Sequence, residues 1–453
     1  MELLASREVV VVSRFVGGDL QARFMSRVRG VDPAVCLVVP VDVGKWSAMA
    51  LVADHHGEIV VAPFEFGLDE PGVRRLLAVI ETQIADRCAV VSRVGVEAAG
   101  HYHRTVVARL RAAGVEVVEL NPAQVKQARA QQLLRRLKSD ERDLGAMAEL
   151  LIRGAGRLPQ VRDDALATQV AWVGHRRRKL TAHVALSNQV QGHLDLVFPG
   201  LGACFDGILT TKAGRVLVRD LADPDRMRRL GLDGLVRFVA RRGVQLRRPK
   251  AEQLLAAAQV ALRLPDAERA PLAALLAADV ALLDALDLEI SRAEAALAEV
   301  LASTPAGVLT TLPGVGVVRA SAYGAAIGDP NRFPNAAAAY RASGLVPAEY
   351  SSAGRRRGGQ HISREGSVEL RTAIIELGRG LANHDVDFAA YRRRLRSSGK
   401  RPMVAAVAVG HRAHRLAFAM LRSQQPFDPT RWATAAAGGP VMAKTGGRPT
   451  RTT

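Results

Sequence analysis

The chain has 453 residues, with 63 Lys and Arg against 44 Asp and Glu, which gives a net charge of +19. This length suits roughly two to four domains and excludes a small protein that depends on disulfides. So large a positive excess indicates a polyanionic partner, either nucleic acid or an anionic membrane surface. The apolar stretches are shorter than the ~18 residues that a membrane span needs, and the first residues lack a secretory signal pattern. The three cysteines have no metal-ligand spacing, which predicts reduced thiols in a cytosolic protein.

The N-terminal third predicts a mixed sheet covered by helices. Residues 1–34 give an ambiguous pattern, and we treat them as an extension without an assigned role. Apolar runs separated by tight turns then predict a meander of three strands, followed by alternating helices and strands. The expected strands are 35–43, 46–53, 58–66, 88–97 and 115–120, and the expected helices are 69–86 and 101–113. This order favours a five-stranded mixed sheet.

The middle of the chain predicts long helices. Residues 163–198 contain the basic cluster 175–179, and residues 200–265 are basic and mostly helical in pattern. Residues 266–302 carry an apolar seam at alternating steps of three and four: Leu272, Leu276, Leu283, Leu286, Ile290, Ala293, Leu297 and Val300, with Asp279 as the polar member. Such a seam requires a partner helix, and we predict from it that the protein self-associates. Short helices and loops are expected over 309–432, and a disordered tail over 433–453.

Four carboxylates are candidates for a metal-binding active site. Asp42 ends the first predicted strand, Glu97 ends the fourth, and Asp140 and Asp143 lie three residues apart on one face of a predicted helix. A helix crossing the edge where those strands end would gather all four acids in one pocket. Clustered carboxylates repel one another, and hard cations such as Mg²⁺ or Mn²⁺ stabilise them. The alternative is that they are ordinary turn and surface acids.

The order of these acids, with the spacing Lys-Ser-Asp-x-x-Asp, resembles the DEDD insertion-sequence transposases. Their N-terminal domain is similar to RuvC-type Holliday-junction resolvases, which have the ribonuclease H fold. The C-terminal part resembles the same family in the blocks Leu-Pro-Gly-Val-Gly (312–316), Ile-Gly-Asp (327–329) with Arg332-Phe333, Gly-Leu-Val-Pro (344–347), Ile-Ser-Arg-Glu-Gly (362–366) and Leu370-Arg371. The resemblance implies a RuvC-like DEDD domain over 35–160, a helical and coiled-coil region over 161–305, and a mainly α-helical serine transposase domain over 306–432.

The C-terminal blocks have a physical meaning of their own. Residues 312–316 read as a Gly turn before a helix start, a helix-hairpin-helix-like pattern whose free backbone N–H groups bind phosphate, although an ordinary helix turn has the same composition. Between Tyr350 and Gly366 lies a flexible loop rich in Ser, Gly and Arg, which by itself would be a solvated basic loop. In the family, a loop serine just after a Tyr is the nucleophile. By register that residue is Ser352, with Ser351 as the alternative.

Basic residues predict the nucleic-acid contacts. Between 341 and 401 there are 13 Lys or Arg against 6 Asp or Glu, which suits a surface that follows phosphates. We expect binding through arginines and through the backbone of the Gly turn. The residues are Arg355, Arg356, Arg357, Arg364, Arg371, Gly314 and Gly316.

Three classes of function compete at this point. The first is an insertion-sequence recombinase that cuts and rejoins DNA through a serine, with Mg²⁺ or Mn²⁺ in the DEDD pocket. The second is a resolvase-like, structure-selective nuclease that needs the carboxylates and water alone. The third is a nucleic-acid-binding protein with decayed sites, which the presence of all four acids and the serines disfavours. The family resemblance further implies a bridge RNA that pairs with donor and target DNA, and dimers that assemble into tetramers.

Overall fold

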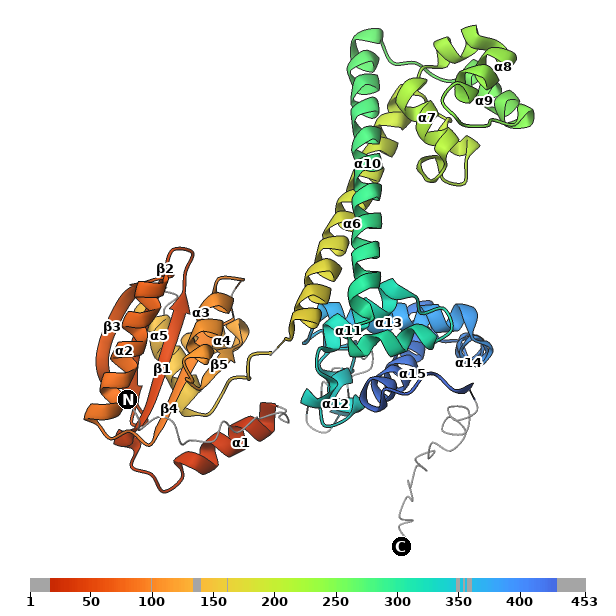
Figure 1. Cartoon of the computed structure of the whole chain (residues 1–453). Coiled ribbons are helices and arrows are strands. Elements are labelled where there is room, and N and C mark those ends of the chain that lie inside the picture. The colour runs from red at the N-terminus through yellow and green to blue at the C-terminus, as the bar shows by residue number, and fades with distance from the viewer. Residues whose placement is uncertain are drawn as a thin grey trace, which may run out of the picture. The chain divides into compact units, whose positions relative to one another are not determined.

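The structure is a computed structural model, and it describes residues 17–98, 100–132, 140–160, 162–347, 351–352, 355–356 and 361–429. The chain forms two compact units, which are described separately (Figure 1). The first contains Met1–Arg162 and Asp329–Arg341, and the second contains Asp163–Gly328 and Ala342–Thr453.

A mixed five-stranded sheet forms the centre of the first unit, as predicted. The strands are β1 Cys36–Val43, β2 Ser47–Asp54, β3 Ile59–Gly67, β4 Val91–Glu97 and β5 Val117–Leu120. Their order in the sheet is β3-β2-β1-β4-β5. The first three strands pair antiparallel, whereas β4 runs parallel to both β1 and β5. This arrangement is consistent with a ribonuclease H-like domain. Strand β4 starts three residues later than expected, because the chain leaves the preceding helix through Cys88 at a positive φ of 50°.

Helices cover both faces of this sheet. They are α1 Gly17–Val28, α2 Glu70–Asp86, α3 His103–Ala112, α4 Pro122–Gln132 and α5 Asp140–Ile152. Side chains of β1 alternate between two cores, so Leu37 and Val39 pack with α2 and α3, while Val38 packs with Leu144 and Leu151 of α5. Gly95 of β4 permits this packing, since a Cβ there would lie 2.4 Å from Leu151. Helix α5 therefore lies close against the sheet.

The N-terminal extension contributes to the first unit through α1. Phe24 is 2% exposed, and its ring lies 4.2 Å from the guanidinium of the fully buried Arg93 on β4. Glu116 forms ion pairs with Arg93 at 3.5 Å and with Arg27 of α1 at 2.5 Å. Burial lowers the pKa of Arg93 to about 10. Part of the extension, which had no role assigned from the sequence, thus covers a buried cation.

The second unit is mostly helical, as expected. Its helices are α6 Asp164–Val197, α7 Lys212–Asp220, α8 Pro224–Ala240, α9 Arg248–Val260, α10 Asp266–Leu301, α11 Val317–Ile327, α13 Val368–His384, α14 Val386–Ser397 and α15 Pro402–Ser423. Short elements complete the description of both units: α12 Ala336–Arg341, β6 Ser351–Ser352, β7 Arg355–Arg356 and the 3-10 segments Pro33–Val35, Gly202–Cys204, Ile208–Thr210, Pro305–Thr311 and Pro330–Arg332. The expected tail over 433–453 lies outside the described residues. Among the helices described, none is both long and apolar enough to cross a membrane.

The seam of α10 finds its partner helix within the same chain (Figure 1). Leu276 and Leu283 are fully buried in one cluster with Val190 and Leu194 of α6. Polar contacts run along the pair: His175 lies 2.9 Å from Glu289, Arg176 lies 2.7 Å from Glu294, and Gln189 donates to Asp279 at 3.1 Å. The inference of self-association from this seam therefore loses its basis, because α6 already covers it.

Shortening a buried side chain of the seam should weaken the packing of α10 against α6. Leu283→Ala removes a fully buried side chain, and we expect it to lower the free energy of unfolding of the second unit by roughly 2–5 kcal/mol. Leu282, which is 53% exposed, is the matched control, and Leu282→Ala should cost about 0.5 kcal/mol or less. Urea unfolding followed by circular dichroism measures both. Equal costs for the two variants would contradict the intramolecular packing.

Candidate active site

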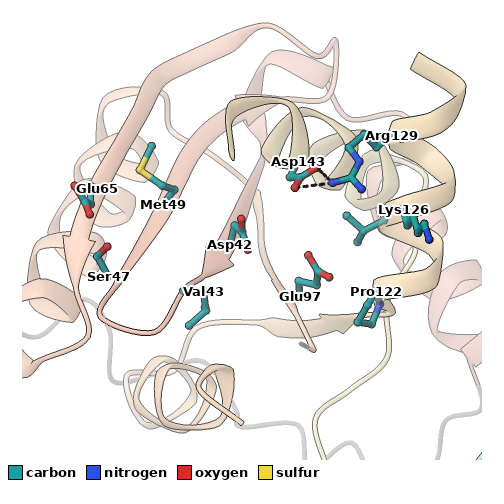
Figure 2. A pocket seen from close by; sticks show the side chains of 12 residues that line it. Asp42, Val43, Ser47, Met49, Glu65, Glu97, Pro122, Lys126, Arg129 and Asp143 are labelled. Atoms are coloured by element: carbon teal, nitrogen blue, oxygen red, sulfur yellow. Dashed lines mark hydrogen bonds and ion pairs between the residues drawn. The ribbon is translucent and has the colours of Figure 1, made fainter. Parts of the chain in front are cut away.

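A polar pocket of about 700 Å³ opens at the carboxyl ends of β1 and β4 (Figure 2). The parallel register pairs Val41 with Val96, so its continuation brings Asp42 beside Glu97. Both side chains are half-buried and line the pocket together with Asp143 of α5. Figure 2 shows these three carboxylates around one space. Two strand ends and one helix thus converge as the sequence predicted.

Cations from α4 form the opposite wall of the pocket. Pro122, Val125, Lys126 and Arg129 recur at steps of three and four along α4 and all line it. Arg129 Nη1 donates to Oδ1 of Asp143 at 2.6 Å and to Oδ2 at 2.8 Å. Asp143 is only 4% exposed, so this charge-assisted contact compensates for the burial of its charge.

Asp140 is the first residue of α5, one helical turn before Asp143. Its side chain lies outside what the structure describes. Within the described part of the chain, no three His, Cys, Asp or Glu side chains are grouped closely enough to hold a metal ion. The donor chemistry nevertheless fits a hard cation, because the carboxylates of Asp42, Glu97 and Asp143 line one pocket, and Asp143 already binds a positive group there.

The serine residues lie on a short hairpin in the second unit. Ser351 pairs with Arg356, and Ser352 pairs with Arg355, in antiparallel register. Side-chain positions in this hairpin and the whole of Arg357 lie outside the described residues. The sequence predicts a flexible loop here, but part of it forms paired strands, so each serine lies opposite an arginine.

Two of the sequence blocks form the base of this hairpin. Pro347 bridges to Ile362, Ser363 N–H donates to Val346 O at 2.8 Å, and Arg364 N–H donates to Gly344 O at 3.0 Å. The segments 344–347 and 362–366 therefore lie side by side.

Arg364 is exposed and has a positive φ of 58°, which is uncommon for a residue other than glycine. Arg371 follows in the first turn of α13, and its Nη2 lies 3.4 Å from Arg364 O. These two expected nucleic-acid contacts are thus neighbours at the base of the hairpin.

The Gly turn 312–316 joins a 3-10 helix to α11. Gly314 has a φ of 71° and faces α13, where an added Cβ would lie 2.4 Å from His384. Its carbonyl accepts a hydrogen bond from Arg319 at 3.1 Å. Gly316, at the start of α11, has open space beside its Cα and no side-chain cap. Of the two glycines, only Gly316 lies open for a ligand.

Comparison with known proteins identifies the family. A model of a DEDD transposase domain matches residues 39–199, and a model of the transposase IS116/IS110/IS902 family matches residues 306–393. The 44.8 kDa protein of insertion element IS116 from Streptomyces clavuligerus is 26% identical over 86% of this chain and 96% of its own length. The 43.6 kDa protein of insertion element IS110 from Streptomyces coelicolor is 28% identical over 63% of this chain and 71% of its own length. The chain belongs to the IS110/IS116 family of transposases.

As an IS110-family transposase, the protein is a DNA-cutting and rejoining enzyme. The first matched region contains all four carboxylates, and the second contains the Gly turn and the serine hairpin. A DEDD transposase domain also indicates the use of a divalent metal. The family assignment made from the sequence is thereby confirmed.

Sequence reasoning missed three charged residues of this transposase's pocket: Glu65, Lys126 and Arg129. Glu65 of β3 could have been found from strand register, because Asp42 pairs with Met49 and Met49 pairs with Glu65. Cross-strand neighbours share a face of the sheet, which places Glu65 on the face of Asp42. Lys126 and Arg129 could have been found from their helical spacing, which places them on the same face as Pro122.

Proposed function

We propose that this transposase cuts and rejoins DNA strands through Ser352, with Asp42, Glu97, Asp140 and Asp143 as metal ligands. The observation that carries the proposal is the convergence of Asp42, Glu97 and Asp143, from three separate elements, on one pocket. Asp140 joins this set as the residue one turn before Asp143. We propose Mg²⁺, or Mn²⁺ in its place, because both are hard ions that prefer carboxylate oxygens.

A divalent ion held by these carboxylates would stabilise the negative charge that develops on a reacting phosphodiester. The protein's own part at this site is to position the ligands. Asp42 and Glu97 are held at adjacent strand ends, and the packing of α5 on the sheet holds Asp143. Arg129 balances the charge of Asp143, and an ion that bound Asp143 would compete with this contact.

Ser352 supplies a different chemistry. Its hydroxyl oxygen forms a bond to phosphorus, the bond from phosphorus to one sugar oxygen breaks, and that sugar oxygen takes the proton that the serine loses. The serine–phosphate bond conserves the energy of the broken phosphodiester, so reversal of the step rejoins strands without ATP. Arg355, paired with Ser352 in register, together with Arg356 and Arg357, would stabilise charge on the phosphate.

Several finer assignments belong to this proposal. The sheet order supports a RuvC-like first domain over 35–160, and the turn before α11 supports a helix-hairpin-helix-like DNA contact. We retain the divisions at 161–305 and 306–432. Arg364, Arg371 and Gly316 are proposed to contact nucleic acid, whereas the packing of Gly314 against α13 removes it from the predicted set. A bridge RNA partner and a dimeric or tetrameric assembly follow from the family resemblance, and a cytoplasmic location is proposed from the cysteine pattern.

Removing one proposed metal ligand should abolish cleavage. Asp42→Asn is nearly isosteric but gives up an anionic ligand, and we expect Mg²⁺-supported cleavage of element-end DNA to fall by about a hundredfold or more. Glu65→Gln is the matched control, since Glu65 lines the same pocket but stands outside the DEDD set. That variant should keep its activity within about tenfold. Wild-type cleavage by Asp42→Asn would remove the pocket from the mechanism.

The serine assignment is tested by trapping the covalent intermediate. Ser352→Ala should bind DNA but form no protein–DNA adduct, because it lacks the attacking oxygen, whereas Ser351→Ala should stay largely active. Mass spectrometry of the trapped parent complex should place DNA on a peptide modified at Ser352. A modification at Ser351 would transfer the role to that residue. Cleavage by the parent without any adduct would favour the water-activating, resolvase-like nuclease instead.

A further inference from the structure

A second pocket lies in the other unit, where the last turns of α14 meet the first turns of α15. It encloses about 410 Å³ and is lined by Arg392, Arg393, Arg396, Pro402, Ala405 and Ala406. All of its charged lining residues are arginines. The pocket belongs neither to the carboxylate site nor to the serine hairpin, and the matched family region ends at residue 393, before α15 begins.

The three arginines share one face of α14. Arg392 and Arg396 are one turn apart, and Arg393 lies three residues before Arg396. Arg392 Nη1 donates to Asn383 Oδ1 at 2.7 Å, and Arg396 Nη1 donates to Lys400 O at 2.6 Å. Both acceptors are neutral, and the guanidinium of Arg393 has no protein partner among the described residues. Three positive charges therefore line the pocket with no carboxylate to balance them.

Helix α15 adds to this positive potential at its N-terminus. Arg401 occupies the position before the first turn and makes no side-chain cap hydrogen bond. By contrast, α6, α13 and α14 begin with Asp163, Ser367 and Asp385, each of which accepts a backbone N–H bond. A helix N-terminus carries partial positive charge, so placing arginines beside it costs stability unless an anion is bound.

We propose that this arginine pocket binds a backbone phosphate of double-stranded DNA. Guanidinium groups bind phosphate oxygens through paired hydrogen bonds, and one face of α14 presents three of them. The lining contains no aromatic side chain that could stack on an unpaired base, which favours a duplex over a single strand. DNA is the substrate class of the enzyme. The proposal needs only DNA binding by this chain, and it is independent of the serine and of the metal ligands.

The test compares two neighbouring arginines of α14. Arg393→Gln removes the guanidinium that lacks a protein partner, and the affinity for a fluorescein-labelled DNA duplex should fall about tenfold in an anisotropy titration. The slope of log affinity against log salt concentration should decrease by about 0.9, the value for one lost phosphate contact. Arg393→Lys keeps the charge but not the paired hydrogen bonds, so its affinity should lie between those of the parent and Arg393→Gln. Because Arg393 is exposed, these variants should fold like the parent.

Arg394→Gln is the control with the same loss of charge from the same helix. Arg394 lies over the ring of Tyr391, 5.3 Å from its centroid, and it does not line the pocket. The affinity of the Arg394→Gln variant for the duplex should fall less than threefold, which is roughly the long-range effect of one charge. An equal loss for Arg394→Gln, or no loss for Arg393→Gln, would overturn the proposal. A loss confined to a labelled RNA duplex, with DNA affinity unchanged, would also overturn it.

Discussion

Asp143 is a charged residue that is only 4% exposed, and an unpaired carboxylate at that depth would destabilise the fold. Arg129 provides the opposing charge through two contacts, at 2.6 and 2.8 Å. This ion pair joins α4 to α5 over the carboxyl ends of β1 and β4. The arrangement of the pocket depends on it, because it compensates for the buried charge of the carboxylate that lines the pocket with Asp42 and Glu97.

The sheet makes this arrangement possible. With β1 at the centre and β4 parallel to it, two strands that are distant in sequence end side by side. The glycine at position 95 lets α5 approach β4 closely enough for its first turns to reach that edge. A transposase of this family thus builds its acidic site from three ordinary local features: two strand ends, one tightly packed helix and one helical row of cations.

Much of this could be predicted from the sequence, for identifiable reasons. Parallel strand ends and an i, i+3 pair of aspartates leave clear local signals, so the pocket formed by Asp42, Glu97 and Asp143 was expected. The ion pair of Arg129 with Asp143 was not expected, because it depends on how α4 packs against α5. The seam of α10 was found, but heptad spacing is the same whether the partner is α6 or another chain. The pairing of Ser352 with Arg355 was missed because the run from Ser351 to Arg357 has no hydrophobic period.

We propose that a divalent cation bound in the carboxylate pocket replaces the Arg129 contact to Asp143. Anomalous scattering from crystals soaked in Mn²⁺ tests it most directly, because the signal locates manganese without reference to activity. We expect a manganese peak among Asp42, Glu97 and Asp143, with the Arg129 guanidinium moved away from Asp143. A pocket without manganese, in which Arg129 still binds Asp143 at saturating Mn²⁺, would contradict it.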